Sequence, residues 1–139
     1  MPDLSRWYVK TALAYLALAL LLGIVIVWPA EGGLQRWQGV FWPAWIHLLT
    51  VGWLTQLIFG VAFWLFPRHS RARPYGPQAL ARAAYPLLNA GIVLRILSEP
   101  AITWTASVWW RGLLMLSALL QWTAGLFMVS YLWTRVKRR

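Results

Sequence analysis

The sequence contains no cysteine, and its only acidic residues are Asp3, Glu31 and Glu99. The absence of thiols excludes disulfides and thiolate-bound metal or iron–sulfur centres. The three carboxylates stand at or beyond the ends of apolar segments. This placement argues against paired-carboxylate catalysis, against a carboxylate proton relay in mid-membrane, and against an oxygen-ligand site for a hard cation.

Charged residues make up only 12% of the 139 residues, whereas 60% of the residues are hydrophobic. Such a chain cannot cover itself with a polar surface as a water-soluble domain does, so we expect it to lie in a lipid bilayer. The formal charge is +10, but the basic residues separate apolar runs and do not line one face. We interpret them, including those of the loop at 68–73 and the tail at 135–139, as topology signals that also attract anionic lipid. We expect no nucleic-acid partner.

Four apolar segments are each long enough, at about 20 residues or more, to cross the hydrocarbon core of a bilayer. They cover approximately residues 11–30, 41–66, 79–98 and 107–134. The sequence thus predicts an all-α integral membrane four-helix bundle that forms a single domain over residues 1–139. The stretches 31–40, 67–77 and 99–106 are expected to connect the spans. No small-residue cleavage site follows the first segment, which we expect to be a retained helix.

Four spans place both chain ends on the same side of the membrane, and the basic residues indicate which side. Ten of the 13 Lys and Arg residues fall on the side of the termini, and Arg36, Arg95 and Arg111 fall on the other. Because positively charged loops stay in the cytoplasm, we expect both termini to be cytoplasmic, in the inner or plasma membrane of a bacterium or archaeon. This asymmetry disfavours a dual-topology transporter.

His47 is the only ionisable residue within the second segment, residues 41–66. An ionisable group is costly to place in a membrane, so it marks a candidate functional site. With the expected topology, His47 lies roughly six residues from the outer end of the helix, or about 9 Å along its axis. At about 100° per residue, the same helix face carries mostly aliphatic residues. These neighbours are Thr50, Val51, Leu54, Ile58 and Val61.

Haem b fits this layout on physical grounds. An imidazole ligates iron, the porphyrin can lie against aliphatic side chains, and the propionates need cations at the polar boundary. Arg95 and Arg111, expected at the outer ends of the third and fourth helices, are candidates for pairing with the propionates. The alternative is that His47 is a buried histidine hydrogen-bonded to a neighbouring helix, and that both arginines extend to the interface.

The segment from His47 to Arg68, HLLTVGWLTQLIFGVAFWLFPR, resembles the second helix of subunit I of the haem-copper oxidase family, which includes oxygen and nitric oxide reductases. In that helix a histidine followed by glycine-bearing apolar turns and a terminal aromatic-x-x-P ligates the low-spin haem. The chain is also similar to short four-helix proteins related to that subunit. The resemblance implies that His47 is a low-spin haem ligand, and the stretch 89–95, NAGIVLR, extends it weakly.

The chain departs from that family in size and in ligands. The full subunit has many more spans, a second haem ligand on a late helix and a histidine cluster that holds copper, and this sequence contains none of these. His69 lies 22 residues beyond His47, about 33 Å along a continuous helix, in the inner basic loop, so it cannot complete the same haem within one chain. We therefore expect no copper site and no oxygen reduction by this chain alone, and whether it is an enzyme stays open.

Two sources remain for a second axial ligand. In a homodimer with a two-fold axis along the membrane normal, His47 of each copy would ligate one shared haem. Within one chain, Met115 on the fourth helix is expected at a similar depth, which would give His/Met ligation. A five-coordinate haem that binds nitric oxide or oxygen, with His47 as its protein ligand, is a further alternative.

Small and polar residues recur at every fourth position on the second and fourth predicted helices. The two series are Gly52, Gln56, Gly60 and Ser117, Gln121, Gly125. Both series are typical of helix contacts. On the second helix the glycines lie opposite His47 and favour close packing, with a hydrogen bond from the glutamine across the contact.

These residues together predict a haem b-binding membrane protein of the cytochrome type, which transfers electrons or binds a diatomic gas and forms a homodimer. A protein of a different class stays open. It would be a small accessory or structural subunit without cofactor, which packs against a larger respiratory-chain partner through its glycine-bearing face. Haem delivery or haem sensing would use the same site and differ in occupancy and exchange rate.

Overall fold

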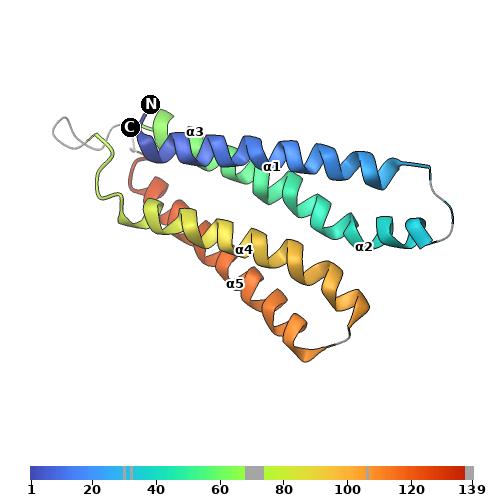
Figure 1. Cartoon of the computed structure of the whole chain (residues 1–139). Helices are drawn as coiled ribbons and strands as arrows, with labels where there is room; N and C mark the ends of the chain where they lie inside the picture. The colour runs from blue at the N-terminus through green and yellow to red at the C-terminus, as the bar shows by residue number, and fades with distance from the viewer. Residues whose placement is uncertain (30, 32, 68–73, 106, 137–139) are drawn as a thin grey trace.

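The computed structural model describes residues 1–29, 31, 33–67, 74–105 and 107–136 (Figure 1). Its helices are α1 (Asp3–Val27), α2 (Gly33–His47), the π-helix η1 (Leu48–Thr55), α3 (Gln56–Leu65), α4 (Ala79–Trp104) and α5 (Val108–Trp133). α2, η1 and α3 follow one another directly and form one rod. The described part of the chain thus has four long helices, each long and apolar enough to span a membrane. The predicted all-α class is confirmed, and so is the prediction of four helices of membrane-spanning length and apolarity.

The helices are longer than the apolar segments that predict them. α2 begins at Gly33, within the stretch 31–40 for which the sequence predicts a connection, and α4 continues to Trp104, where the sequence predicts a turn. Both predictions are wrong. Hydropathy locates the apolar part of a helix but not its polar end turns. A helix ends where its backbone hydrogen bonds end, and this can lie beyond the apolar segment. The predicted basic loop at 68–73 lies outside the described residues.

The bundle consists of two pairs of long helices (Figure 1). α1 packs along η1 and α3, α5 packs along α4, and α2 lies against both α1 and α4. α1 begins and α5 ends at the same end of the bundle, as four antiparallel passes require. Because α4 contacts both α2 and η1, it is the element that joins the two pairs.

Glycines on the rod allow α1 to approach its backbone. A Cβ at Gly60 would lie 2.8 Å from the Tyr8 Cβ, so a larger residue there would displace α1, and one at Gly52 would lie 3.0 Å from the Tyr15 Cγ, which is a tight contact. Ser5 Oγ donates a hydrogen bond of 2.5 Å to the Gly60 carbonyl. The predicted close packing of this face is therefore confirmed.

Gln56, between these two glycines, is fully buried, but neither atom of its side-chain amide has a hydrogen-bond partner among the described residues. The predicted glutamine hydrogen bond across the contact is therefore wrong. The tyrosine hydroxyls of α1 bond to α4 instead. Tyr8 Oη donates to the Ala81 carbonyl (3.1 Å), and Tyr15 Oη donates to Asn89 Oδ1 (3.0 Å). These two bonds tie α1 to α4 across the interior.

α4 and α5 approach each other closely at Gly91. A Cβ there would lie 2.7 Å from the Gln121 Cγ. Ser117 Oγ donates to the Gly91 carbonyl (2.7 Å) and accepts from Gln121 Nε2 (3.0 Å). The predicted contact is confirmed for Ser117 and Gln121. It is wrong for Gly125, because a Cβ there would meet no described atom of a neighbouring segment within 4 Å.

Arg135 closes the end of the bundle at which α1 begins. The residue is only 1% exposed, and its guanidinium donates to the carbonyls of Phe63 (2.6 Å), Phe66 (2.5 Å) and Pro67 (3.1 Å). These carbonyls stand at the C-terminal end of α3, where the helix itself supplies no further donors. Arg135 is thus a helix cap, and its interpretation as a lipid-attracting tail residue is wrong because the side chain is buried.

Replacing Arg135 tests this cap. We expect Arg135→Ala to lower the free energy of unfolding by about 2–4 kcal/mol, because hydrogen bonds from a charged group are worth about 1.5–3 kcal/mol each. Arg135→Lys keeps the charge but lacks the planar fork of donors, so it should recover only part of the loss. Unfolding in mixed micelles measures the difference. The control is Arg6→Ala, at an arginine whose side chain is 59% exposed, and equal stability of the two alanine variants would contradict the capping role.

Candidate functional site

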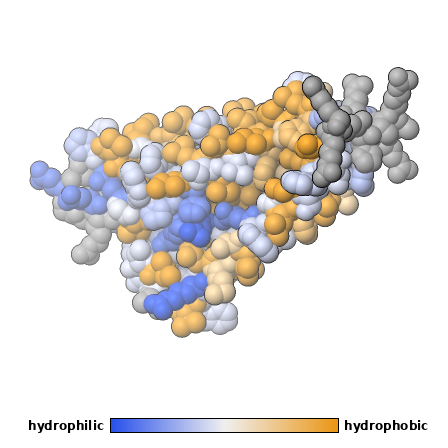
Figure 2. Space-filling model, turned by 180° about the vertical axis from the view of Figure 1, so that it is seen from behind, coloured by the Kyte–Doolittle hydropathy of each residue, from blue (hydrophilic) through white to orange (hydrophobic). Residues whose placement is uncertain are grey.

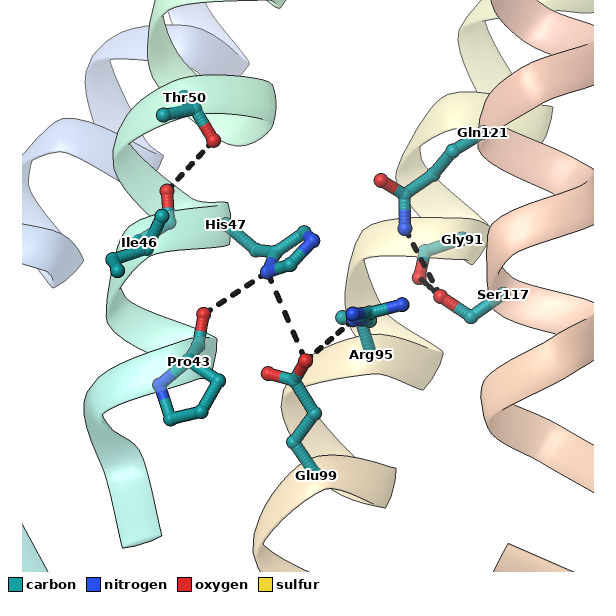
Figure 3. Close-up of polar contacts among 9 residues, drawn as sticks. All are labelled: Pro43, Ile46, His47, Thr50, Gly91, Arg95, Glu99, Ser117 and Gln121. Atoms are coloured by element: carbon teal, nitrogen blue, oxygen red, sulfur yellow. Dashed lines mark hydrogen bonds and ion pairs between the residues drawn. The ribbon is translucent and has the colours of Figure 1, made fainter. Parts of the chain in front are cut away.

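His47 is the last residue of α2 and directly precedes η1. Its Nδ1 lies 3.0 Å from the carbonyl oxygen of Pro43, one helical turn earlier (Figure 3). Since a carbonyl oxygen only accepts hydrogen bonds, Nδ1 is the nitrogen that donates in this contact, and Nε2 takes no part in it. Nε2 has no hydrogen-bond partner among the described residues, and the side chain is 26% exposed. His47 thus presents the nitrogen that a metal ion would bind.

Two charged residues of α4 lie next to His47 (Figure 3). Arg95 Nε donates a hydrogen bond of 2.6 Å to Glu99 Oε1, and the same oxygen lies 3.8 Å from His47 Nδ1. The side chains of Arg95 and Glu99 are 21% and 8% exposed. Glu99 Oε2 has no hydrogen-bond partner within the described part of the chain. A nearly buried carboxylate at the contact of two helices is therefore part of the site.

From the sequence, Glu99 is expected in a connection, at the end of an apolar segment. That expectation is wrong, because α4 continues past Glu99 and brings its side chain next to His47 of α2. The signal that could have located it is its spacing of four residues from Arg95, which places an acid and a base on one face of a helix. Pro100 obscures this signal, since proline usually marks a helix end.

The π-helix η1 changes the geometry next to His47. Thr50 Oγ1 donates to the Ile46 carbonyl, and Thr55 Oγ1 donates to the Thr50 carbonyl, both at 2.8 Å. π-helical turns are rare and frequently occur at functional sites. Because a π-helix turns through a smaller angle per residue than an α-helix, η1 alters the direction of His47 relative to α3 from that in the continuous α-helix that the sequence predicts.

The residues predicted to share the face of His47 accordingly have different surroundings. Thr50 and Leu54 are exposed on the rod, and Leu54 has 47% of its surface accessible. Val51 is only partly exposed and packs against the hydrophobic core. The outer surface of the rod that follows His47 therefore carries Thr50 and Leu54, while Val51 contributes to the interior.

Arg111 and Met115 lie on α5, and both are exposed, Met115 at 68%. Within the described residues, no hydrogen bond or ion pair joins the Arg111 side chain to another residue. α5 packs mainly against α4, whereas His47 belongs to α2. The structure thus brings His47, Arg95 and Glu99 together, and Arg111 and Met115 are outside that cluster.

The surface of the bundle is mostly hydrophobic, and a patch of hydrophilic residues interrupts it on the face shown in Figure 2. Large apolar side chains are exposed on all four long helices. Examples are Leu21 (62%) on α1, Leu65 (64%) on the rod, Leu97 (58%) on α4 and Trp109 (83%) on α5. Apolar exposure over every helix is typical of a protein whose sides face lipid, and it indicates a multi-pass membrane protein.

No group of three or more His, Cys, Asp or Glu side chains comes together as a metal site among the described residues. Haem is a different case, because the porphyrin supplies four nitrogens to the iron and a chain needs to provide only one ligand. Comparisons of the chain with protein-family models, curated proteins and solved structures found no match. The resemblance of residues 47–68 to a low-spin haem helix therefore rests on the residues of that segment alone.

Proposed function

We propose that the chain is a membrane haem b protein in which His47 is an axial ligand of the iron. The observation that carries this proposal is the hydrogen bonding of the imidazole. Its Nδ1 donates to the Pro43 carbonyl at 3.0 Å, and its Nε2 has no hydrogen-bond partner among the described residues. Metal-bound histidines usually have this arrangement, since a hydrogen bond from the second nitrogen fixes the tautomer and the ring orientation.

The residues around His47 are compatible with a bound porphyrin. The exposed Thr50 and Leu54 would flank the macrocycle, which prefers such surfaces to water. Arg95 uses only its Nε for the hydrogen bond to Glu99, so the two terminal nitrogens of its guanidinium could donate to a propionate. The exposed Arg111 is the second candidate cation for the propionates. When bound, the haem supplies one-electron transfer or the binding of a diatomic gas.

We assign the second axial position to His47 of a second copy, in a symmetric homodimer. A two-fold axis along the membrane normal brings the same residue of both chains to one site, so a single histidine per chain suffices. His/Met ligation by Met115 is the less favoured alternative, because that side chain is 68% exposed on α5 and α5 packs mainly against α4.

We also propose that both termini face the cytoplasm of a bacterium or archaeon, in its inner membrane. The support is the excess of basic residues in the sequence stretches that precede the first span, join the second and third spans, and follow the fourth. In that orientation His47 and Arg95 lie toward the outer leaflet.

A second candidate is a cofactor-free accessory subunit of a respiratory membrane complex. The ion pair between Arg95 and Glu99, with His47 3.8 Å away, favours it, because these groups partly satisfy one another without any ligand. Haem delivery or sensing would use the site of the first proposal, with a haem that exchanges.

The visible spectrum of the purified protein tests the haem proposal. We expect a Soret band with sharp α and β bands after reduction, because a bis-histidine haem is six-coordinate. His47→Ala should abolish these bands by removing the ligand, and His69→Ala, at the only other histidine, should leave them unchanged. No absorbance after expression with ample haem would refute the proposal and favour the accessory subunit.

The haem-to-chain ratio tests how the second ligand is supplied. A haem shared by two His47 side chains requires a ratio near one to two, measured as pyridine haemochrome against protein mass. Met115→Leu removes the alternative sulfur ligand while conserving volume, and we expect it to leave the spectrum and the reduction potential unchanged. A ratio near one to one, together with a changed spectrum in Met115→Leu, would contradict the shared site.

The absence of cysteine makes the topology testable by labelling single introduced cysteines in intact cells. We expect Glu31→Cys, at an exposed residue between α1 and α2, to react with a membrane-impermeant maleimide. Asp3→Cys and Val136→Cys, at the other end of the bundle, should react only after the cells are permeabilised. The reverse pattern would overturn the proposed orientation.

A further inference from the structure

Glu99 is a nearly buried acidic residue, and helix packing does not explain why a carboxylate stands at this position. Its side chain is 8% exposed, its Oε1 accepts from Arg95 Nε at 2.6 Å, and its Oε2 has no hydrogen-bond partner in the described ranges of the chain. A nearly buried carboxylate oxygen without a partner is costly. The single hydrogen bond from Arg95 leaves the second oxygen of this carboxylate unsatisfied, so the ion pair by itself does not offset the burial of Glu99.

The position of Glu99 relative to the imidazole is specific. Its Oε1 lies 3.8 Å from His47 Nδ1, the nitrogen whose proton is bound by the Pro43 carbonyl at 3.0 Å. Figure 3 shows this oxygen on the Nδ1 side of the ring, with the second ring nitrogen pointing away from it. A negative charge at this place favours a proton on Nδ1 and increases the electron density available at Nε2.

We propose that Glu99 is a positioning residue for His47, which holds the imidazole in the tautomer that binds haem iron and lowers the reduction potential of that haem. Arg95 holds the carboxylate in place through its Nε. This inference rests on the proposed function, and it adds a residue on a different helix that controls the ligand.

The direction of the effect follows from charge. One electron converts ferric to ferrous haem and removes one positive charge, so a nearby carboxylate stabilises the ferric form. The effect is weakly screened, because Glu99 is almost buried. The chain offers a matched control, since Asp3 also carries one negative charge and an arginine partner, but its side chain is 86% exposed at the end of the bundle where α1 begins.

Potentiometry of the haem-loaded full-length protein tests the inference. Glu99→Gln keeps the shape of the side chain and removes its charge, and we expect the haem to become easier to reduce by at least tenfold in the reduction equilibrium, which is 59 mV for one electron. Glu99→Asp keeps the charge at a greater distance and should give a smaller rise. Asp3→Asn should leave the potential unchanged. Equal potentials in the wild-type protein and both Glu99 variants would overturn the inference while leaving haem binding by His47 intact.

Nitrogen-15 NMR of histidine in the haem-free protein gives a readout that needs no haem. In a His69→Ala background only His47 contributes, and we expect a protonated Nδ1 and an unprotonated Nε2. Glu99→Gln leaves the Pro43 carbonyl as the one acceptor near Nδ1 among the described residues, so we expect it to add the second tautomer to the pattern, and an unchanged pattern would overturn the positioning role. Failure of the wild-type protein to bind haem is a separate result, which would overturn the proposed function and with it the effect on the potential.

Discussion

The close contact of α1 with the rod formed by α2, η1 and α3 determines the position of the other helices. Gly60 and Gly52 let the Tyr8 and Tyr15 side chains lie directly on the rod backbone. From there the tyrosine hydroxyls extend to α4 and bond to Ala81 and Asn89. Because the outer surface of the bundle is apolar, these hydroxyls find their hydrogen-bond partners in the interior, on α4. The distance between α1 and the rod therefore also fixes the place of α4.

The position of α4 in turn defines the surroundings of His47. The rod carries the imidazole and the Pro43 carbonyl that holds its Nδ1–H, while α4 carries Arg95 and Glu99 four residues apart on one face. His47 thus has two neighbours of different origin. The Pro43 carbonyl lies one helical turn earlier in α2, and the Glu99 carboxylate belongs to α4. In the proposed haem site, this arrangement would leave Nε2 for the iron, and Glu99 would act on the imidazole from the second helix without contacting the haem.

The two ends of the bundle are organised by different physical requirements. At the end where α1 begins, Arg135 satisfies the last carbonyls of α3 and is buried in doing so. At the level of His47, the side chains of His47 and Arg95 are partly exposed (26% and 21%) and that of Glu99 is nearly buried (8%), beside helices whose outer surfaces are apolar. The sequence presents all of these as basic or acidic residues near the ends of apolar runs. Their roles differ because Arg135 donates to backbone carbonyls at the end of α3, whereas Arg95 donates to the side chain of Glu99.

The sequence alone determined the four helices, their approximate spans, the glycine contact on the rod and the choice of His47 as the residue to explain, because hydropathy and helical spacing are local properties. It did not predict the helix ends or the capping role of Arg135, and the hydrogen bond that it predicts for Gln56 is absent among the described residues. Only the tertiary structure decided that η1 is a π-helix and that Glu99 faces His47. Both depend on how α1, α4 and the rod pack together, and a contact between residues 52 positions apart leaves no mark in the local pattern of a single chain.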